Sequence, residues 1–454
     1  MAPVGSGADP SLVVPYLFAL MQRNLATAGF VIADHNQSSG PPAPGAFSVP
    51  GCVLASPSWE VAGYDYPGNV AQIAEDYAFN WTRDAAITMA TLLNAASSLL
   101  PAAASAQLSA NYVAFARTCQ AGGGVLGQAK YTPEGGPTNA ADESDGPALR
   151  ILTVLQSWPS LPSAQQELAA GVIAADLGYL LDDDRYQAGT VTHWEDTYGQ
   201  SLFARCVQLR CFNEVMAQGQ ALGLTVPNGT STAAQWLAQA ISSHWSEQGS
   251  YYVSVLGAER LSGDPQAPYD PSIDPILACV YGSGIEPTDP ELLSTAAQVR
   301  AQWAAGGAAA YPINAADNDI GLGPVLGRYL GDQYDGLSLT SDTGHPWAVC
   351  TCAFAQLYYE VASVIANGAS VPGDQLADEF FAQLGLTSST PSAQVVGALR
   401  SAGDNMLNAI VYHSNNYELS EQFDQQTGYE RSVANLTWSY AAYISAVAVR
   451  SKIP

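Results

Sequence analysis

Residues 343–363 read "TGHPWAVCTCAFAQLYYEVAS", and this stretch decides the fold class. From Ala348 to Ser363 nearly every position is apolar, so a helix over these residues would have no polar face. A helix that is apolar all round has to be buried on every side. The stretch therefore predicts a helix over 347–367 in the interior of a helical protein.

The rest of the chain alternates apolar-periodic segments with loops rich in Gly, Pro and Asp. One strand pattern stands out, "SYYVSVLG" at 250–257. With no internal repeat and no low-complexity linker, the pattern predicts one all-α domain over 1–454. Besides 347–367, the predicted helices cover 10–29, 84–100, 103–119, 146–158, 163–182, 200–222, 231–247, 289–304, 374–384, 392–412 and 436–450.

The composition excludes several classes of partner. The chain has 15 basic and 41 acidic residues, which gives a formal net charge of −26. Such a field repels nucleic acid and acidic membranes. No uninterrupted apolar run approaches the ~20 residues that span a bilayer. We expect a soluble monomer whose partner is a neutral molecule.

The cellular compartment is indicated only weakly. The N-terminus lacks the basic end and the cleavage site of a secretory signal, so a secreted protein would be a mature form with an added Met. Four Asn-X-Ser/Thr sequons, at Asn36, Asn80, Asn228 and Asn435, are compatible with secretion and N-glycans. We expect an extracellular protein.

Seven cysteines are scattered without a Cys-X-X-Cys motif. Cys206 and Cys211 are candidates for a disulfide, whereas Cys350 and Cys352 lie in the apolar stretch and are typical of core packing. The five histidines have no spacing typical of metal ligands, so we expect neither a metal nor a cofactor.

Clusters of aromatic and charged residues precede five of the predicted helices. They read "NWTRD" (80–84), "ESDGPALR" (143–150), "HWEDTYGQ" (193–200), "TGHPW" (343–347) and "SEQFDQQTGYERSVAN" (420–435). In the first cluster, Thr82 is a candidate N-cap. If these five helices form a parallel inner ring, their N-termini converge on one mouth lined by Trp, Tyr, Arg and carboxylates.

Such a mouth has the chemistry of a sugar pocket. Aromatic faces stack on the C–H surfaces of a pyranose, while Arg and Asp hold its hydroxyls. Two carboxylates facing each other across the pocket are what hydrolysis of a glycosidic bond requires.

Taken together, these segments resemble fungal glucoamylases of glycoside hydrolase family 15. The resemblance runs from "LASPS" (54–58) to "LTWSYAA" (436–442), with the motifs in family order. It rests on "DYAFNWTRDAA", "VLGQAKY", "DGPALR", "WED" where the family has "WEE", "GRY", "PW", and "SEQFD" where the family has "SEQYD". It implies an (α/α)6 barrel and an inverting, exo-acting α-glucosidase whose substrate is an α-glucan.

The resemblance also implies roles for single residues. Glu195 falls on the general acid and Glu421 on the general base that activates water. Asp196 takes the place of the neighbouring second carboxylate, shortened from Glu. The substrate-binding residues that the resemblance implies are Tyr77, Trp81, Arg83, Asp84, Trp194, Asp196, Arg328, Trp347 and Trp438.

Three features depart from the family pattern. The loop "TPEGGPTNAADES" (132–144) is short and lacks the family's tryptophan, so a stacking surface beyond the first sugar is lost. A segment of about fifteen residues, 59–73, intervenes before "DYAFNWTRD" and is a candidate for the pocket rim. The chain ends soon after the last predicted helix, so we expect no starch-binding domain.

Other interpretations remain open for the same residues. "WED" could be a solvated acidic loop, Arg328 an anchor for the acidic loop after it, and Trp347 and Trp438 core aromatics. His193 could tune the acid or be a hydrogen-bonding neighbour. At the level of function, the alternatives are a hydrolase of another α-glucoside (isomaltose, dextran or trehalose) and an inactive carbohydrate-binding relative.

Overall fold

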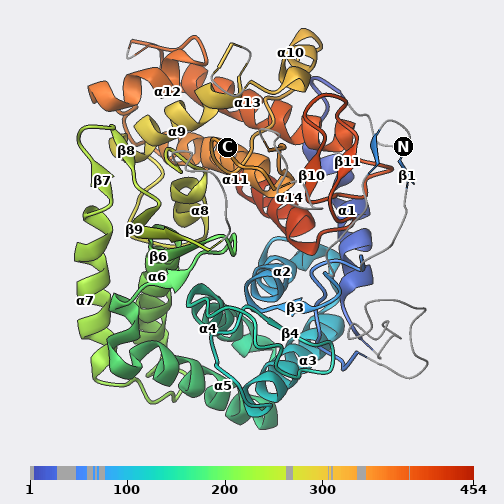
Figure 1. Ribbon diagram of the computed structural model, residues 1–454, viewed down its shortest axis with the longest axis vertical. Helices are drawn as coiled ribbons and strands as arrows, with labels where there is room; N and C mark the ends of the chain where they lie inside the picture. Colours follow the sequence, from blue (N-terminus) through green and yellow to red (C-terminus); the bar gives the residue numbers. More distant parts are fainter. Residues whose placement is uncertain are drawn as a thin grey trace.

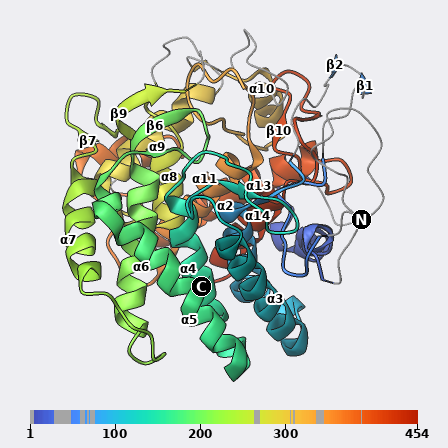
Figure 2. The same cartoon turned by 60° about the horizontal axis from the view of Figure 1, so that its bottom comes forward.

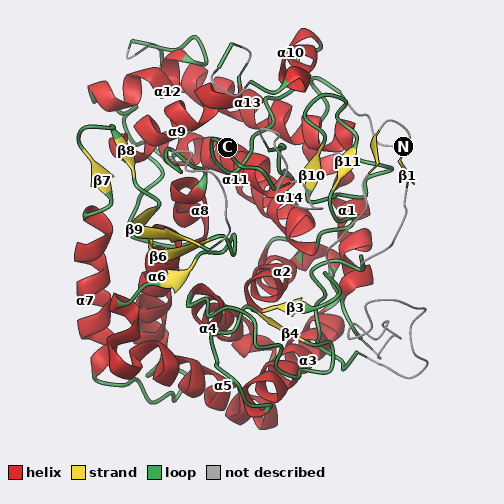
Figure 3. Ribbon diagram, viewed as in Figure 1, coloured by secondary structure: helices red, strands yellow, loops and turns green. Residues whose placement is uncertain are grey.

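A computed structural model describes residues 5–27, 48–58, 65–66, 69–70, 77–261, 269–304, 306–307, 310–334, 344–387 and 389–454. Within these ranges the chain is mainly helical, with short two- and three-stranded sheets between helices (Figure 3). The predicted pocket rim at 59–73 falls largely outside the described residues, and the sequon at Asn36 falls outside them.

Six helices form a closed inner ring in which each packs against the next and the last packs against the first (Figure 1). In order, the inner helices are α2 (Thr82–Asn94), α4 (Asp145–Ser157), α6 (Leu202–Gln218), α8 (Asp274–Tyr281), α11 (Ala348–Ala366) and α14 (Thr437–Arg450). Their sequences are apolar because most of their residues are covered by neighbours.

Six further helices lie outside the ring and alternate with the inner helices along the chain (Figure 1). The alternation of inner and outer helices makes the fold an (α/α)6 barrel, as predicted. The outer helices are α1 (Val14–Met21), α3 (Ala102–Ala121), α5 (Ser163–Leu181), α7 (Gly229–Ser242), α9 (Pro290–Trp303) and α13 (Ser392–His413); the short α10 (Pro312–Asp319) and α12 (Asp378–Ala382) are additions.

The stretch 348–363 is an inner helix. In α11, fifteen of nineteen residues are buried, from Ala348 to Ile365. The helix is long and apolar enough to cross a membrane, but 83% of its most apolar window is buried inside the protein. Its composition therefore reflects a place within the ring.

All twelve predicted helices are present, with boundaries that shift by a few residues, and two short ones, α8 and α10, were missed. The N-cap prediction for Thr82 is wrong. Trp81 has the extended backbone of an N-cap because the strand β3 (Asn80–Trp81) pairs with β4 (Lys130–Tyr131), so the helix begins at Thr82. The hydroxyl of Thr82 makes no capping bond.

The disulfide prediction is also wrong. All seven cysteines are free, and Cys206 and Cys211 are both buried on α6. Five residues along a helix correspond to about 140° of rotation, so the two side chains leave the helix on different faces. Cys350 and Cys352 are core residues, as predicted.

Short strands gather at one end of the barrel, where the inner helices begin (Figure 2). A three-stranded antiparallel sheet pairs β6 (Thr197–Ser201) with β5 (Thr190–Val191) and β9 (Val255–Arg260). β10 (Gln422–Phe423) pairs with β11 (Glu430–Arg431). The predicted strand at 250–257 is found in part, as β8 (Tyr251–Tyr252), which pairs with β7 (Trp245–Ser246), and the start of β9. β1 (Asp65–Tyr66) pairs with β2 (Asn69–Val70).

Hydrogen bonds tie the N-terminal segment to the start of α14. The Asn24 amide nitrogen donates to Asn435 O at 2.8 Å and to Thr437 Oγ1 at 2.7 Å, all three residues being buried. The Thr437 N–H donates to Ala55 O at 2.7 Å. These bonds fix the last inner helix beside the segment that leads into the first one.

The substitution Asn24→Ala is expected to lower the free energy of unfolding by about 2 kcal/mol, because it removes two buried hydrogen bonds and leaves Asn435 O without this donor. Urea unfolding measures the change. Asn367→Ala, which removes a similar bond at the exposed end of α11, is the matched control and is expected to cost less than about 0.5 kcal/mol. Equal losses of unfolding free energy in the two variants would show that the buried bonds of Asn24 stabilise the protein no more than an exposed bond does.

Candidate active site

A cavity of about 400 Å³ lies at the end of the barrel where the inner helices begin. It brings together all eleven residues that the sequence analysis named. They are Tyr77, Trp81, Arg83, Asp84, Trp194, Glu195, Asp196, Arg328, Trp347, Glu421 and Trp438, and the lining is completed by Lys130, His193, Tyr329, Tyr334 and Leu436.

Glu195 lies in the turn between β5 and β6, just ahead of α6. Its φ of 60° is in the left-handed region, and its N–H donates to Thr192 O at 2.8 Å. A left-handed glutamate costs of order 1 kcal/mol, and its surroundings must enforce it. Trp81 Nε1 donates to Glu195 Oε1 at 2.6 Å, so the strained backbone delivers the carboxyl group to the pocket wall.

Four hydrogen bonds to described residues hold Glu421. Its own N–H donates to Val433 O at 3.0 Å, and its carbonyl oxygen accepts from the N–H of Ala348, the first residue of α11, at 3.1 Å. On the side chain, Oε1 accepts from the Tyr77 hydroxyl at 3.0 Å and Oε2 accepts from the Ser432 hydroxyl. The carboxylate is thus presented to the cavity by two hydroxyl donors.

The two glutamates are held by two adjoining rings. Tyr77 binds Glu421, Trp81 binds Glu195, and the centroids of the two rings are 5.2 Å apart with an interplanar angle of 31°. Because each ring holds one carboxyl group, the pair keeps the two acids in one cavity on separate donors. Lys130 Nζ lies 4.3 Å from the Trp81 ring and covers it.

One buried guanidinium neutralises a group of carboxylates beside Glu195. Arg83 Nη1 contacts Glu143 Oε2 at 2.5 Å and Asp145 Oδ2 at 3.3 Å, and Arg83 Nε lies 3.5 Å from Asp84 Oδ1. Burial raises the pKa of Asp84 to about 6 and that of Glu143 well above its usual range, although Arg83 opposes both shifts; the charge of Glu195 adds to them. Burial likewise raises the pKa of Asp145. The group therefore retains protons in mildly acidic solution.

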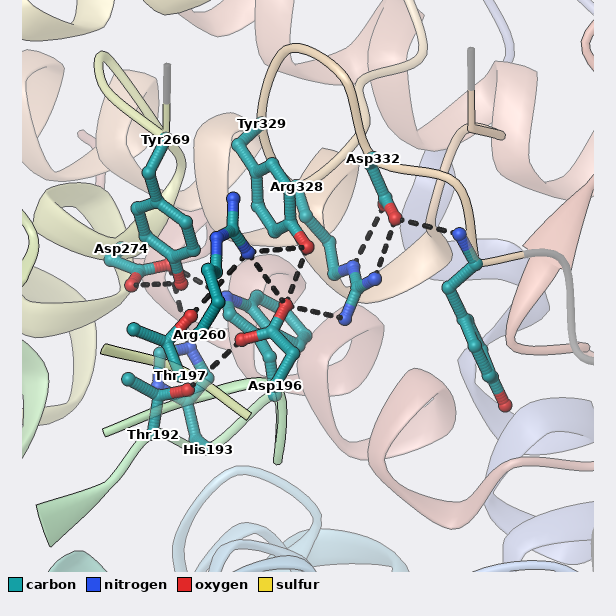
Figure 4. Close-up of polar contacts among 12 residues, drawn as sticks. Thr192, His193, Asp196, Thr197, Arg260, Tyr269, Asp274, Arg328, Tyr329 and Asp332 are labelled. Atoms are coloured by element: carbon teal, nitrogen blue, oxygen red, sulfur yellow. Dashed lines mark hydrogen bonds and ion pairs between the residues drawn. The ribbon is translucent and has the colours of Figure 1, made fainter. Parts of the chain in front are cut away.

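Asp196 takes part in a network of tyrosine and arginine side chains (Figure 4). Its Oδ2 accepts from the Tyr329 hydroxyl at 2.5 Å and lies 3.8 Å from Arg328 Nη1 and 3.6 Å from Arg260 Nη1. Arg328 also makes a two-pronged bond to Asp332, at 2.8 and 2.6 Å. Arg328 thus anchors the following acidic loop, as one interpretation of the sequence has it, and it also lines the cavity.

Three tryptophans form one wall. Trp194 stacks with Trp438 at 6.2 Å between centroids and meets Trp347 edge-on at 5.2 Å. The guanidinium of Arg328 lies over Trp347 and that of Arg83 over Trp438. Although Trp347 and Trp438 are only about 5% exposed, both face the cavity, so they are pocket and core aromatics at once.

Behind this wall lies an acid that the sequence analysis missed. Asp274, the first residue of α8, accepts from Trp194 Nε1 at 2.7 Å and from the Tyr269 hydroxyl at 3.1 Å. Burial raises the pKa of Asp274 to about 7. His193 Nε2 is 3.6 Å from Asp274, and burial together with Arg83 and Arg328 lowers the pKa of His193 well below its usual value. His193 is therefore a neutral neighbour of the site.

Sequence reasoning missed several other residues in or next to the cavity. Lys130 and Tyr329 belong to the quoted motifs "VLGQAKY" and "GRY", so a signal for them existed. Glu143 stands two positions before "DGPALR". Tyr334 and Arg260 carry no signal, because only chain folding brings their loops to the mouth.

The fold and the cavity define a class of protein. A helical barrel whose inner helices begin at a pocket with aromatic walls and two separately held carboxyl groups is the arrangement of enzymes that cleave glycosidic bonds.

The chain belongs to glycosyl hydrolases family 15, whose family model matches residues 43–448. It is 26% identical over 418 residues to glucoamylase 1 of Rhizopus oryzae, covering 84% of this chain and 65% of the relative. It is 23% identical over 425 residues to a probable glucoamylase of Schizosaccharomyces pombe, covering 89% and 86% of the two chains.

Solved structures agree on the fold. The glucoamylase of Hypocrea jecorina superimposes with a TM-score of 0.77 at 22% identity, covering 98% of this chain and 72% of that one. The glucoamylase of Saccharomycopsis fibuligera gives 0.74 at 22% identity, covering 99% and 97%. The chain spans just under two thirds of the length of the Rhizopus relative.

The carboxylates around Arg83 lead to a prediction for Glu143→Gln. Because burial raises the pKa of Glu143 in the folded protein, the native state binds more protons than the unfolded chain above the ordinary value of 4.5, and stability is lost as pH rises. The glutamine keeps an oxygen for Arg83 without this penalty. Relative to wild type, the variant is expected to gain about 1 kcal/mol of unfolding free energy per pH unit above pH 4.5.

Urea unfolding at pH 4.5, 5.5 and 6.5 checks this prediction. Glu134→Gln, at an exposed loop position, is the control and is expected to give a constant small difference. A pH-independent effect of Glu143→Gln would contradict the raised pKa.

Proposed function

We propose that this protein is an inverting, exo-acting α-glucosidase that releases β-D-glucose from the nonreducing ends of α-glucans. The observation that carries the proposal is the presence of Glu195 and Glu421 in one cavity, each held by its own aromatic donor. Relatives named glucoamylase support it.

In the proposed reaction, Glu195 gives its proton to the glycosidic oxygen as the bond to the anomeric carbon breaks. A poor alkoxide leaving group thereby departs as a neutral hydroxyl. Glu421 accepts a proton from a water molecule, whose oxygen bonds to the anomeric carbon from the opposite face. One water is consumed, Glu195 ends ionised and Glu421 protonated, and the configuration is inverted.

The cavity supports an exo mode of attack. Trp194, Trp347 and Trp438 form one of its walls, and its volume is at the lower end of the range for ligand pockets. Arg83 and Asp84 line it at the start of α2, and in this proposal they bind sugar hydroxyls. A chain end fits such a small pocket better than the middle of a polymer.

A hydrolase of another α-glucoside, such as isomaltose, dextran or trehalose, is the second candidate. It is favoured by Asp196 in place of the family's Glu and by the absence of tryptophan from 132–144. An inactive carbohydrate-binding protein is disfavoured, because binding alone does not need two carboxyl groups held on separate donors. A panel of these substrates with maltose and starch, followed by NMR, separates the candidates.

The assigned roles of Glu195 and Glu421 predict different losses in their glutamine variants. On maltose, Glu195→Gln is expected to lower kcat by about 100- to 10,000-fold, because the leaving alkoxide is no longer protonated. On α-D-glucosyl fluoride it is expected to keep most of its activity, because fluoride leaves without a proton. Glu421→Gln is expected to lose both activities, because both need an activated water.

Initial rates and the anomer first formed, read by NMR, provide the measurement. Equal loss of the two activities in Glu195→Gln, or an active Glu421→Gln, would falsify the assignment.

We also propose that the protein is secreted and monomeric. Of the sequons in the described residues, Asn80 is buried, with its amide donating to Val53 O at 2.8 Å, and Asn435 is buried against Tyr440. Asn228 is exposed, just before α7.

On secretion from a eukaryotic host, we therefore expect a glycan at Asn228 and none at Asn80 or Asn435. Peptide mapping before and after glycosidase treatment tests this expectation, with Asn228→Gln as the control. A glycan on Asn80 would be incompatible with the fold around β3.

A further inference from the structure

Strand pairing places Arg260 beside the segment that carries Glu195. Arg260 is the last residue of β9 and lies opposite Thr197 in the antiparallel pair of β6 and β9. The next N–H, that of Leu261, donates to Asp196 O at 2.9 Å. The backbone of β9 therefore holds Arg260 in register with Asp196.

The guanidinium of Arg260 completes the environment of the Asp196 carboxylate (Figure 4). Its Nη1 lies 3.6 Å from Asp196 Oδ2 and contacts the Tyr329 hydroxyl at 3.3 Å and Thr197 Oγ1 at 3.4 Å. It also lies over the rings of Tyr269 and Tyr329, which are themselves stacked at 4.5 Å. These contacts hold a long side chain in one orientation.

Arg260 differs from the other arginine near Asp196. The side chain of Arg328 is 4% exposed and forms its shortest ion pair with Asp332. The side chain of Arg260 is 20% exposed, and among the described residues Arg260 forms its ion pair with Asp196. The charge of Arg260 is thus free to act on Asp196. The Asp196 carboxylate lines the cavity directly after Glu195 in the chain.

In the proposed reaction Glu195 stands next to the oxygen of the departing sugar. Asp196 follows it in the chain and lines the same cavity, so in this scheme Asp196 faces the leaving sugar. An aspartate reaches less far than a glutamate, and its carboxylate needs a fixed orientation to accept hydrogen bonds from sugar hydroxyls. Arg260 and the Tyr329 hydroxyl supply that orientation.

We propose that Arg260 determines specificity for the leaving sugar by holding Asp196 in position to bind that sugar's hydroxyls. This inference rests on the proposed function. Arg260 is a positioning residue in this scheme. The ligand that it selects is the leaving glucosyl unit, whose free hydroxyls would bind to Asp196.

The test compares maltose, which has a leaving sugar, with α-D-glucosyl fluoride, which has none. In Arg260→Gln, kcat/KM for maltose is expected to fall about tenfold, the loss typical for one hydrogen bond to a charged group, while kcat/KM for the fluoride stays within about twofold. Arg260→Lys, which keeps the charge, is expected to recover part of the loss on maltose.

Arg185→Gln is the matched control. Arg185 is also partly exposed, lies over a tyrosine ring (Tyr179, 4.3 Å) and pairs with an aspartate (Asp142, 3.1 Å) outside the cavity. It is expected to leave both substrates unaffected. Thermal unfolding of each variant confirms that the protein is folded in the assay.

A double-mutant cycle with Asp196→Asn tests the route of the effect. If Arg260 acts through Asp196, adding Arg260→Gln to Asp196→Asn is expected to cost little more on maltose than Asp196→Asn alone. Fully additive losses overturn the proposal, as do equal losses on maltose and the fluoride or a fully active Arg260→Gln. A wild-type protein inert toward both substrates would contradict the proposed function itself.

Discussion

The packing of α14 against α2 closes the inner ring, and the geometry of the cavity depends on this closure. Asn24 donates hydrogen bonds to Asn435 and Thr437, and the Thr437 N–H donates to Ala55 O, which joins the two ends of the chain. Arg83 at the start of α2 lies over Trp438 at the start of α14. Because every inner helix begins at the same end, loops that are far apart in sequence meet there. Without closure, Glu195 and Glu421 would have no common cavity.

Charge within the cavity is balanced by very few cations. Arg83 faces Glu143, Asp145 and Asp84, and Arg328 and Arg260 face Asp196. Burial raises the pKa of Asp84 to about 6 and of Asp274 to about 7, so protons take the place of missing cations in acid. Stability from these groups is greatest below their ordinary pKa and decreases as pH rises toward neutrality.

Aromatic rings give the site its rigidity. Tyr77 and Trp81 each hold one glutamate, and Trp194 is fixed by its bond to Asp274 and by its contacts with Trp347 and Trp438. Planar side chains with a single N–H or O–H lose little freedom when they bind a carboxyl group, so they hold it in a narrow range of orientations. The same principle extends to Asp196, which accepts a hydrogen bond from the Tyr329 hydroxyl and lies beside Arg260 and Arg328.

The sequence by itself determined twelve of the helices and the inner position of 348–363, because apolar periodicity is a local property. The eleven residues that share one cavity followed from the resemblance of their motifs to family 15. Sequence reasoning gave no indication of α8, which is only eight residues long, and so of Asp274 at its start. It also misplaced the cap of α2 and suggested a disulfide on α6, since strand pairing and helix faces are not visible in spacing alone. Only the tertiary structure decided that Arg83 contacts three carboxylates and that Arg260 lies against Asp196. Those contacts join loops that are far apart in the sequence, and the closure of the ring brings these loops together.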